Sequence, residues 1–170
     1  GCDNERVILI NSFSKTYAMT GWRIGYIMSA NKEAMNQMIK LQYYITACSN
    51  DAMQYAVLTA INDADDYPDE MCAEFKARRD LICSRLNKMP GVQCHVPEGA
   101  FYVFPKVDVP GMTSEEVAIE LLKGGVLCSP GSAFGPSGEG HLRFAYTISR
   151  EDISLGMDKT EAVLMRLRGD

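Results

Sequence analysis

Two apolar runs stand near the start of the chain, separated by a polar and glycine-containing stretch. The run 7–10, Val-Ile-Leu-Ile, predicts a buried strand, and the run 24–28, Ile-Gly-Tyr-Ile-Met, predicts a second one. Further on, apolar residues recur at helical spacing. They predict one helix after Asn31 and another capped by Asn50 or Asp51. A strand buried on both faces is typical of a parallel sheet, so we expect its neighbouring strands to come from sequence outside this chain.

The pattern changes after an acidic run at 63–68 that contains a proline. A long helix is predicted over Pro68–Met89. The alternation over 92–96 and the apolar run 100–104 predict a β-hairpin. The sequence T-x-x-E at 113–116 is a capping box that opens a further helix.

The last part of the chain continues the mixture of strands and helices. A strand is predicted over 126–128, a Gly-, Pro- and Ser-rich loop over 129–140, an alternating strand over 141–146, and a helix capped by Ser149. We therefore expect a compact α+β layer, with helices over a mostly antiparallel sheet.

Composition narrows the class of protein. Of the 170 residues, 46% are hydrophobic and 23% charged, and the net charge is −5, which argues against a nucleic-acid surface. No apolar run approaches the length of about 20 residues that a membrane helix needs. The six cysteines form no C-x-x-C pair and there are only two histidines, so we expect reduced thiols, no metal site and a cytoplasmic protein.

The stretch between the first two predicted strands carries the candidate chemistry. Lys15 lies among small and aromatic residues, and Arg23 follows it. A lysine withdrawn from water favours the neutral amine, which is the form that attacks a carbonyl, and an arginine supplies a forked cation for a phosphate or carboxylate. The alternative is that both cations flank a solvated surface turn.

The whole stretch favours the chemical interpretation. It resembles the pyridoxal-phosphate attachment site of the class I and II aminotransferases, in particular the aspartate and aromatic aminotransferase branch. The constrained positions that match are Ser12, Phe13, Ser14, Lys15, Ala18, Met19, Gly21, Arg23, Ile24 and Gly25. The strand–loop–strand context is also the one that this motif requires.

A second candidate residue lies on the strand predicted over 141–146. Leu142, Phe144 and Tyr146 share one face, which places Arg143 on the opposite face. A lone arginine there is commonly solvated. However, the segment 131–143 resembles the aminotransferase region whose arginine grips the substrate α-carboxylate, and the loop before it has the composition of a flexible lid.

The resemblance implies a fold and a set of roles. Residues 1–66 would be the C-terminal portion of the large cofactor-binding domain of a type I aminotransferase, an incomplete α/β domain, and residues 67–170 the small C-terminal α+β domain. Lys15 would form the Schiff base with pyridoxal 5'-phosphate and move the proton of the substrate. Ser12, Ser14 and Arg23 would hold the cofactor phosphate, and Arg143 the substrate carboxylate.

The resemblance also implies the substrates, and it implies that some cofactor-binding residues lie outside this chain. An L-amino acid of aspartate or aromatic type and a 2-oxo acid such as 2-oxoglutarate would be the substrates, and the intact enzyme would be a homodimer. The family residues that pair with the cofactor ring come from upstream sequence. We therefore expect this chain, which begins without Met, to be a fragment that is inactive alone.

Two alternatives remain at this stage. A C–S lyase or a cyclopropane-forming synthase would use the same fold and cofactor for another reaction. A non-catalytic dimerisation or binding module would reuse the fold without chemistry.

Overall fold

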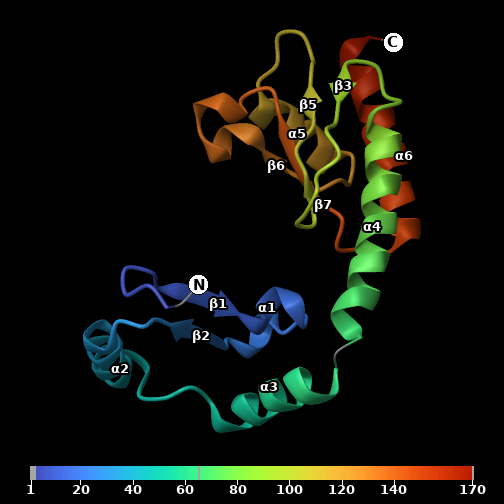
Figure 1. Cartoon of the computed structure of the whole chain (residues 1–170). Coiled ribbons are helices and arrows are strands. Elements are labelled where there is room, and N and C mark those ends of the chain that lie inside the picture. Colours follow the sequence, from blue (N-terminus) through green and yellow to red (C-terminus); the bar gives the residue numbers. More distant parts are fainter. Residues whose placement is uncertain (1–2, 65, 170) are drawn as a thin grey trace. The chain divides into compact units, whose positions relative to one another are not determined.

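The computed structural model describes residues 3–64 and 66–169, and these form two compact units (Figure 1). The first unit is Gly1–Met71 and the second is Cys72–Asp170. The division falls within helix α4 (Tyr67–Leu86).

The first unit is built on a two-stranded antiparallel ladder. Strand β1 (Leu9–Ser12) pairs with β2 (Gly25–Met28), with Leu9 opposite Met28 and Ser12 opposite Gly25. Between the strands lie the single-turn helix α1 (Phe13–Thr16) and the 3-10 turn η1 (Thr20–Trp22). The two predicted strands are therefore present, joined by the stretch that carries the candidate lysine.

Helices α2 (Lys32–Thr46) and α3 (Asp51–Asp63) complete this unit. Asn31 accepts a hydrogen bond from the Ala34 N–H, and Asn50 accepts one from the Met53 N–H. Both helices thus begin at predicted caps, because an asparagine side chain satisfies an N–H that the first helical turn leaves unpaired.

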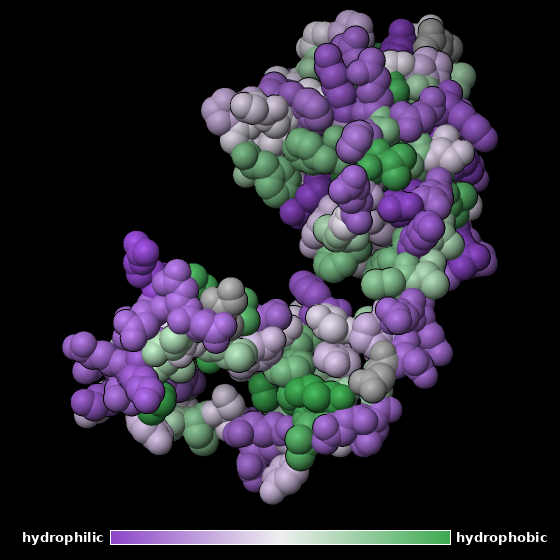
Figure 2. All heavy atoms as spheres, viewed as in Figure 1, coloured by the Kyte–Doolittle hydropathy of each residue, from purple (hydrophilic) through white to green (hydrophobic). Residues whose placement is uncertain are grey.

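The prediction that 7–10 is buried is wrong for the described chain. Ile10 is 72% exposed and its neighbours Val7, Ile8 and Leu9 are exposed as well. Among the described residues, β1 pairs only with β2, and Met19 and Val57 are the only buried apolar side chains of this unit. Apolar side chains consequently lie at its surface (Figure 2).

The second unit packs helices against antiparallel strands. Besides α4 it contains α5 (Ser114–Lys123) and α6 (Arg150–Arg168). Helices α4 and α6 run side by side (Figure 1), and ion pairs of Arg85 with Asp158 and of Arg150 with Glu74 join them. The Thr113–Glu116 capping box and the Ser149 cap are confirmed.

The strands of this unit pair differently from the predicted hairpin. Strand β3 (Val92–Gln93) pairs with β5 (Lys106–Val107), while β4 (Tyr102–Val103) pairs with β7 (Leu142–Ala145). The other edge of β7 binds β6 (Ser129–Pro130). The hairpin prediction is wrong because each apolar run finds its partner further along the chain, and the strand predicted at 126–128 lies slightly later, at β6.

The described hydrophobic core cluster lies in the second unit. Leu86 on α4, Leu121 on α5, Leu142 on β7 and Leu164 on α6 are each at most 1% exposed. Strand β7 alternates as predicted, since Leu142 and Phe144 are buried and Arg143 faces away from the core. The outer face of this sheet is therefore where a polar site can form.

Candidate functional site

The connection between β1 and β2 positions the candidate cofactor residues. Ser12 ends β1, Lys15 lies on α1, and Arg23, which follows η1, adopts a left-handed backbone conformation with φ 52° two residues before β2 begins. This backbone conformation is uncommon for a residue with a Cβ and marks a locally constrained turn. The predicted serine, lysine and arginine thus stand on one short, structured connection.

Lys15 is exposed in the described chain. Helix α1 has no buried residue, because it is a single turn at the end of a two-stranded ladder. The predicted desolvation of the amine is therefore not provided by the described residues.

Ser12 and Ser14 flank the start of α1 and are both partly buried. Ser12 is the N-cap residue with an extended backbone, yet its hydroxyl makes no capping hydrogen bond. The Ser14 carbonyl accepts a hydrogen bond from the Thr20 hydroxyl at 3.0 Å, which ties α1 to η1. The Ser12 hydroxyl therefore does not cap the helix, and it could donate a hydrogen bond to a phosphate oxygen.

The Arg23 side chain is exposed, and its Nη1 donates to the Thr20 carbonyl at 2.8 Å. No carboxylate within the described ranges forms an ion pair with it. A guanidinium carries five N–H donors, so most of them stay available for an anion.

Two hollows adjoin this connection within the first unit. One of about 700 Å³ is bordered by Ser12, Phe13 and Tyr17 of the connection and by α3. Another, of about 430 Å³, is bordered by Arg23, Ser49 and Asn50. Ser12 and Arg23 therefore border different hollows. The donor set itself, an amine, two hydroxyls and an unpaired guanidinium, fits a phosphorylated aldehyde.

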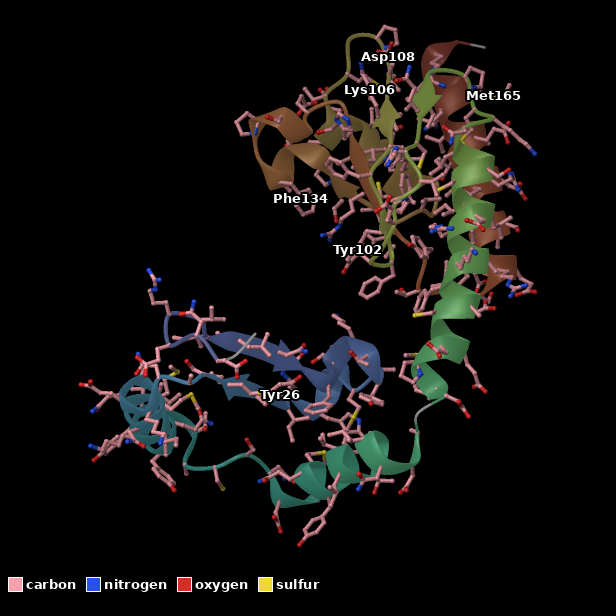
Figure 3. All side chains as sticks on the ribbon, in the orientation of Figure 1. Tyr26, Tyr102, Lys106, Asp108, Phe134 and Met165 are labelled. Atoms are coloured by element: carbon pink, nitrogen blue, oxygen red, sulfur yellow. The ribbon has the colours of Figure 1, made fainter. Side chains whose placement is uncertain are left out.

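Arg143 lies in the second unit, partly buried on the outer face of β7. Its Cζ atom lies 4.6 Å from the ring centroid of Tyr102 and 4.5 Å from that of Phe134. Figure 3 labels these two aromatic residues, which come from β4 and η2. Its Nη2 donates to the Ser129 hydroxyl at 3.3 Å.

The Gly- and Pro-rich segment before β7 differs from the predicted flexible loop. It forms two 3-10 turns, η2 (Gly131–Phe134) and η3 (Pro136–Gly138). The Glu139 carboxylate accepts hydrogen bonds from the Ser114 N–H at 2.6 Å and the Ser114 hydroxyl at 3.0 Å. These bonds lower the pKa of Glu139 below its usual value, the backbone N–H contributing most. The segment is therefore structured and anchored to α5, which differs from the irregular loop predicted over 129–140.

The aromatic neighbours of Arg143 were not identifiable from local sequence. Tyr102 reaches it because β4 pairs with β7, placing Tyr102 opposite Ala145. Phe134 reaches it because η2 folds back beside β7.

The sequence matches the family model "Aminotransferase class I and II" over residues 1–159. The chain belongs to this family. The fold is accordingly that of the C-terminal part of a type I aminotransferase.

The similar proteins are mostly named as aminotransferases. A probable aspartate aminotransferase of Methanocaldococcus jannaschii is 46% identical over 162 residues, covering 91% of this chain and 42% of the relative. An aspartate aminotransferase of Pyrococcus abyssi is 41% identical over 163 residues, covering 94% of this chain and 41% of the relative. The chain therefore spans about two fifths of the length of these relatives, and it matches their C-terminal part.

Solved structures of aminotransferases are also similar to this chain over part of their length. The aromatic aminotransferase from Pyrococcus horikoshii OT3 superposes with a TM-score of 0.88 at 39% identity, covering 95% of this chain and 44% of that chain. The aspartate aminotransferase from Rhizobium meliloti gives a TM-score of 0.87 at 34% identity, covering 95% and 42%. The fold class predicted from the resemblance is confirmed.

The described residues show neither a membrane-spanning helix nor a metal-binding cluster. Neither 3–64 nor 66–169 contains a helix long and apolar enough to cross a membrane. The same residues hold no cluster of three or more His, Cys, Asp or Glu side chains arranged to bind a metal ion.

Proposed function

We propose that this chain supplies the C-terminal part of a pyridoxal-phosphate-dependent aminotransferase. The observation that carries the proposal is the β1–β2 connection, in which Ser12, Lys15 and Arg23 occupy one short structured stretch of a family member. An amine, a hydroxyl and a guanidinium are the groups that such a cofactor requires from its protein.

Each residue has a distinct proposed role. Pyridoxal phosphate, when bound, supplies an aldehyde that condenses with amines and a ring that accepts electrons. The Lys15 Nζ would attach to the cofactor and, when released, move the proton at the substrate Cα. Ser12 and Arg23 would donate hydrogen bonds to the phosphate oxygens, with Ser14 as a further donor. Arg143 would bind the α-carboxylate of the substrate.

The proposed substrates follow from the relatives. Aspartate and aromatic aminotransferases are among the similar proteins, so we propose an L-amino acid of one of these types and a 2-oxo acid such as 2-oxoglutarate. A cytoplasmic homodimer is the proposed state of the intact enzyme. The names of the relatives favour amino-group transfer over C–S cleavage or cyclopropane formation.

A chimera tests the function directly. In it, this chain replaces the matched C-terminal part of the M. jannaschii relative. We expect transfer from aspartate or an aromatic amino acid to 2-oxoglutarate, measured as glutamate formation. The isolated chain should give no comparable turnover, because the groups that hold the cofactor ring are not among its residues. Release of pyruvate and ammonia from a cysteine conjugate would favour the lyase instead.

The Lys15→Ala variant of the chimera tests the proposed role of Lys15 in cofactor attachment and proton transfer. We expect turnover to fall by about 1,000-fold or more, because both the attachment and the proton transfer are lost. The visible absorbance of the bound cofactor should disappear as well. Lys40→Ala, which removes an exposed lysine from α2, is the matched control and should retain both. Survival of absorbance and turnover in Lys15→Ala would support a non-catalytic binding module.

A further inference from the structure

Arg143 is held mainly by aromatic rings rather than by an acidic partner. Its Cζ atom lies over the Tyr102 ring at 4.6 Å and over the Phe134 ring at 4.5 Å. Both distances are well within the range in which the face of an aromatic ring attracts a cation. No carboxylate of the described ranges pairs with this arginine.

The hydrogen-bond donors of this guanidinium are largely unused. Nη2 donates to the Ser129 hydroxyl at 3.3 Å, a long bond to a neutral acceptor. A guanidinium has five N–H donors in a fixed plane, and contacts with ring faces consume none of them. The cation is therefore restrained in position while its N–H groups stay available to a planar anion.

The two rings are themselves fixed by the fold. Tyr102 belongs to β4, and its ring lies 4.6 Å from that of Phe101. Phe134 ends η2 and packs edge-on against Phe104 with ring centroids 5.8 Å apart, and Phe104 in turn stacks on His141 with centroids 5.1 Å apart. Each ring is thus braced by a second ring, which prevents it from turning away from the arginine.

We propose that Tyr102 and Phe134 are positioning residues that hold Arg143 ready for the substrate carboxylate. The proposal rests on the proposed aminotransferase function. A long arginine side chain loses conformational freedom when it grips an anion. Rings that restrict the side chain beforehand reduce that loss on binding. Because the rings contact the arginine that would bind the carboxylate, we expect them to act on substrate binding.

Kinetics of the chimera test the proposal. In Tyr102→Leu and in Phe134→Leu, we expect KM for both the amino acid and the 2-oxo acid to rise about 3- to 10-fold, with kcat changed less than about 2-fold. Tyr102→Phe and Phe134→Tyr keep the rings and are the matched controls, with KM near that of the parent. An unchanged KM in both leucine variants, or a loss confined to kcat, would overturn the proposal.

A second measurement does not depend on activity. In the isolated chain, the Arg143 Nε–Hε resonance, assigned by its loss in Arg143→Lys, should be shifted upfield by the ring currents. We expect the shift to diminish in each leucine variant and to persist in the ring-preserving ones. If this resonance lies at its random-coil chemical shift in the parent chain, the proposal is contradicted even if the chimera is inactive. An inactive parent chimera with an intact upfield shift contradicts only the aminotransferase function.

Discussion

At the scale of single residues, the Glu74 carboxylate shows how one side chain joins two helices. It accepts a hydrogen bond from the Arg78 Nε at 2.7 Å on its own helix and pairs with Arg150 at the start of α6. Arg150 is the larger cause, and Arg78 the next, of a pKa for Glu74 below its ordinary value of 4.5. The Arg78 pair has the i,i+4 spacing that brings two side chains together on one helix, whereas Arg150 reaches Glu74 only because α4 and α6 lie side by side.

The lowered pKa of Glu74 predicts how stability depends on pH. A carboxylate whose pKa is depressed by folding stabilises the folded state above its unfolded pKa, and that contribution is lost as pH falls through the folded value. Glu74→Gln should therefore lower the Tm of the second unit at pH 7 by about 1–4 °C, since the pair is solvent-exposed. The difference from the parent should shrink as pH falls below 4.5.

Circular dichroism melting at pH 7 and at acidic pH measures this difference. Glu98→Gln, in an exposed loop, is the control and should melt like the parent at both values. If Glu74→Gln lowers Tm equally at both pH values, the loss of stability does not come from the ionised Glu74–Arg150 pair.

At the scale of elements, the turns before β7 depend on two glycines that touch. A Cβ built on Gly131 would lie 2.0 Å from the Gly138 carbonyl oxygen and 2.6 Å from that of His141. The Gly131 N–H also donates to the His141 carbonyl at 2.8 Å. The glycine-rich composition, interpreted from sequence as flexibility, thus serves close backbone packing that holds Phe134 beside Arg143.

Gly131→Ala should consequently destabilise the second unit. We expect a loss of about 2–4 kcal/mol in the free energy of unfolding, because the atoms that the new Cβ would meet belong to the backbone and cannot turn aside. Gly99→Ala is the matched control, since a Cβ there meets nothing within 4 Å. It should change the free energy by less than about 0.5 kcal/mol. Urea titration measures both, and equal midpoints for the two variants would contradict the packing argument.

At the scale of the whole chain, buried apolar surface is divided unequally between the units. The described core cluster lies in Cys72–Asp170, whereas β1, β2, α2 and α3 leave many large apolar side chains exposed, such as Tyr44 at 90%. Burial of apolar area is the main stabilising contribution to folding. The second unit should therefore be the more stable of the two.

Limited trypsin digestion of the isolated chain should show this difference. We expect early cleavage after Lys15, Arg23 and Lys40, and a persistent product that contains β3 to α6, identified by mass spectrometry. In the chimera the same three sites should be cleaved more slowly, because the relative's remaining sequence completes the domain. Equal cleavage rates across both units of the isolated chain would contradict the unequal stability.

The sequence by itself determined the local features of this protein. Helix starts at Asn31, Thr113 and Ser149 follow from side chains that bind N–H groups a few residues away, and the alternation over 141–146 follows from the period of a strand. The β1–β2 connection, and with it the family, was identifiable for the same reason, since its motif is contiguous.

Only the tertiary structure decided the long-range features. The pairing of β4 with β7, the packing of Phe134 against Arg143, and the exposure of the run 7–10 all depend on which distant segment is present to make contact. A one-dimensional pattern records which side of an element is apolar, but the partner that covers it is selected by the packing of the whole chain.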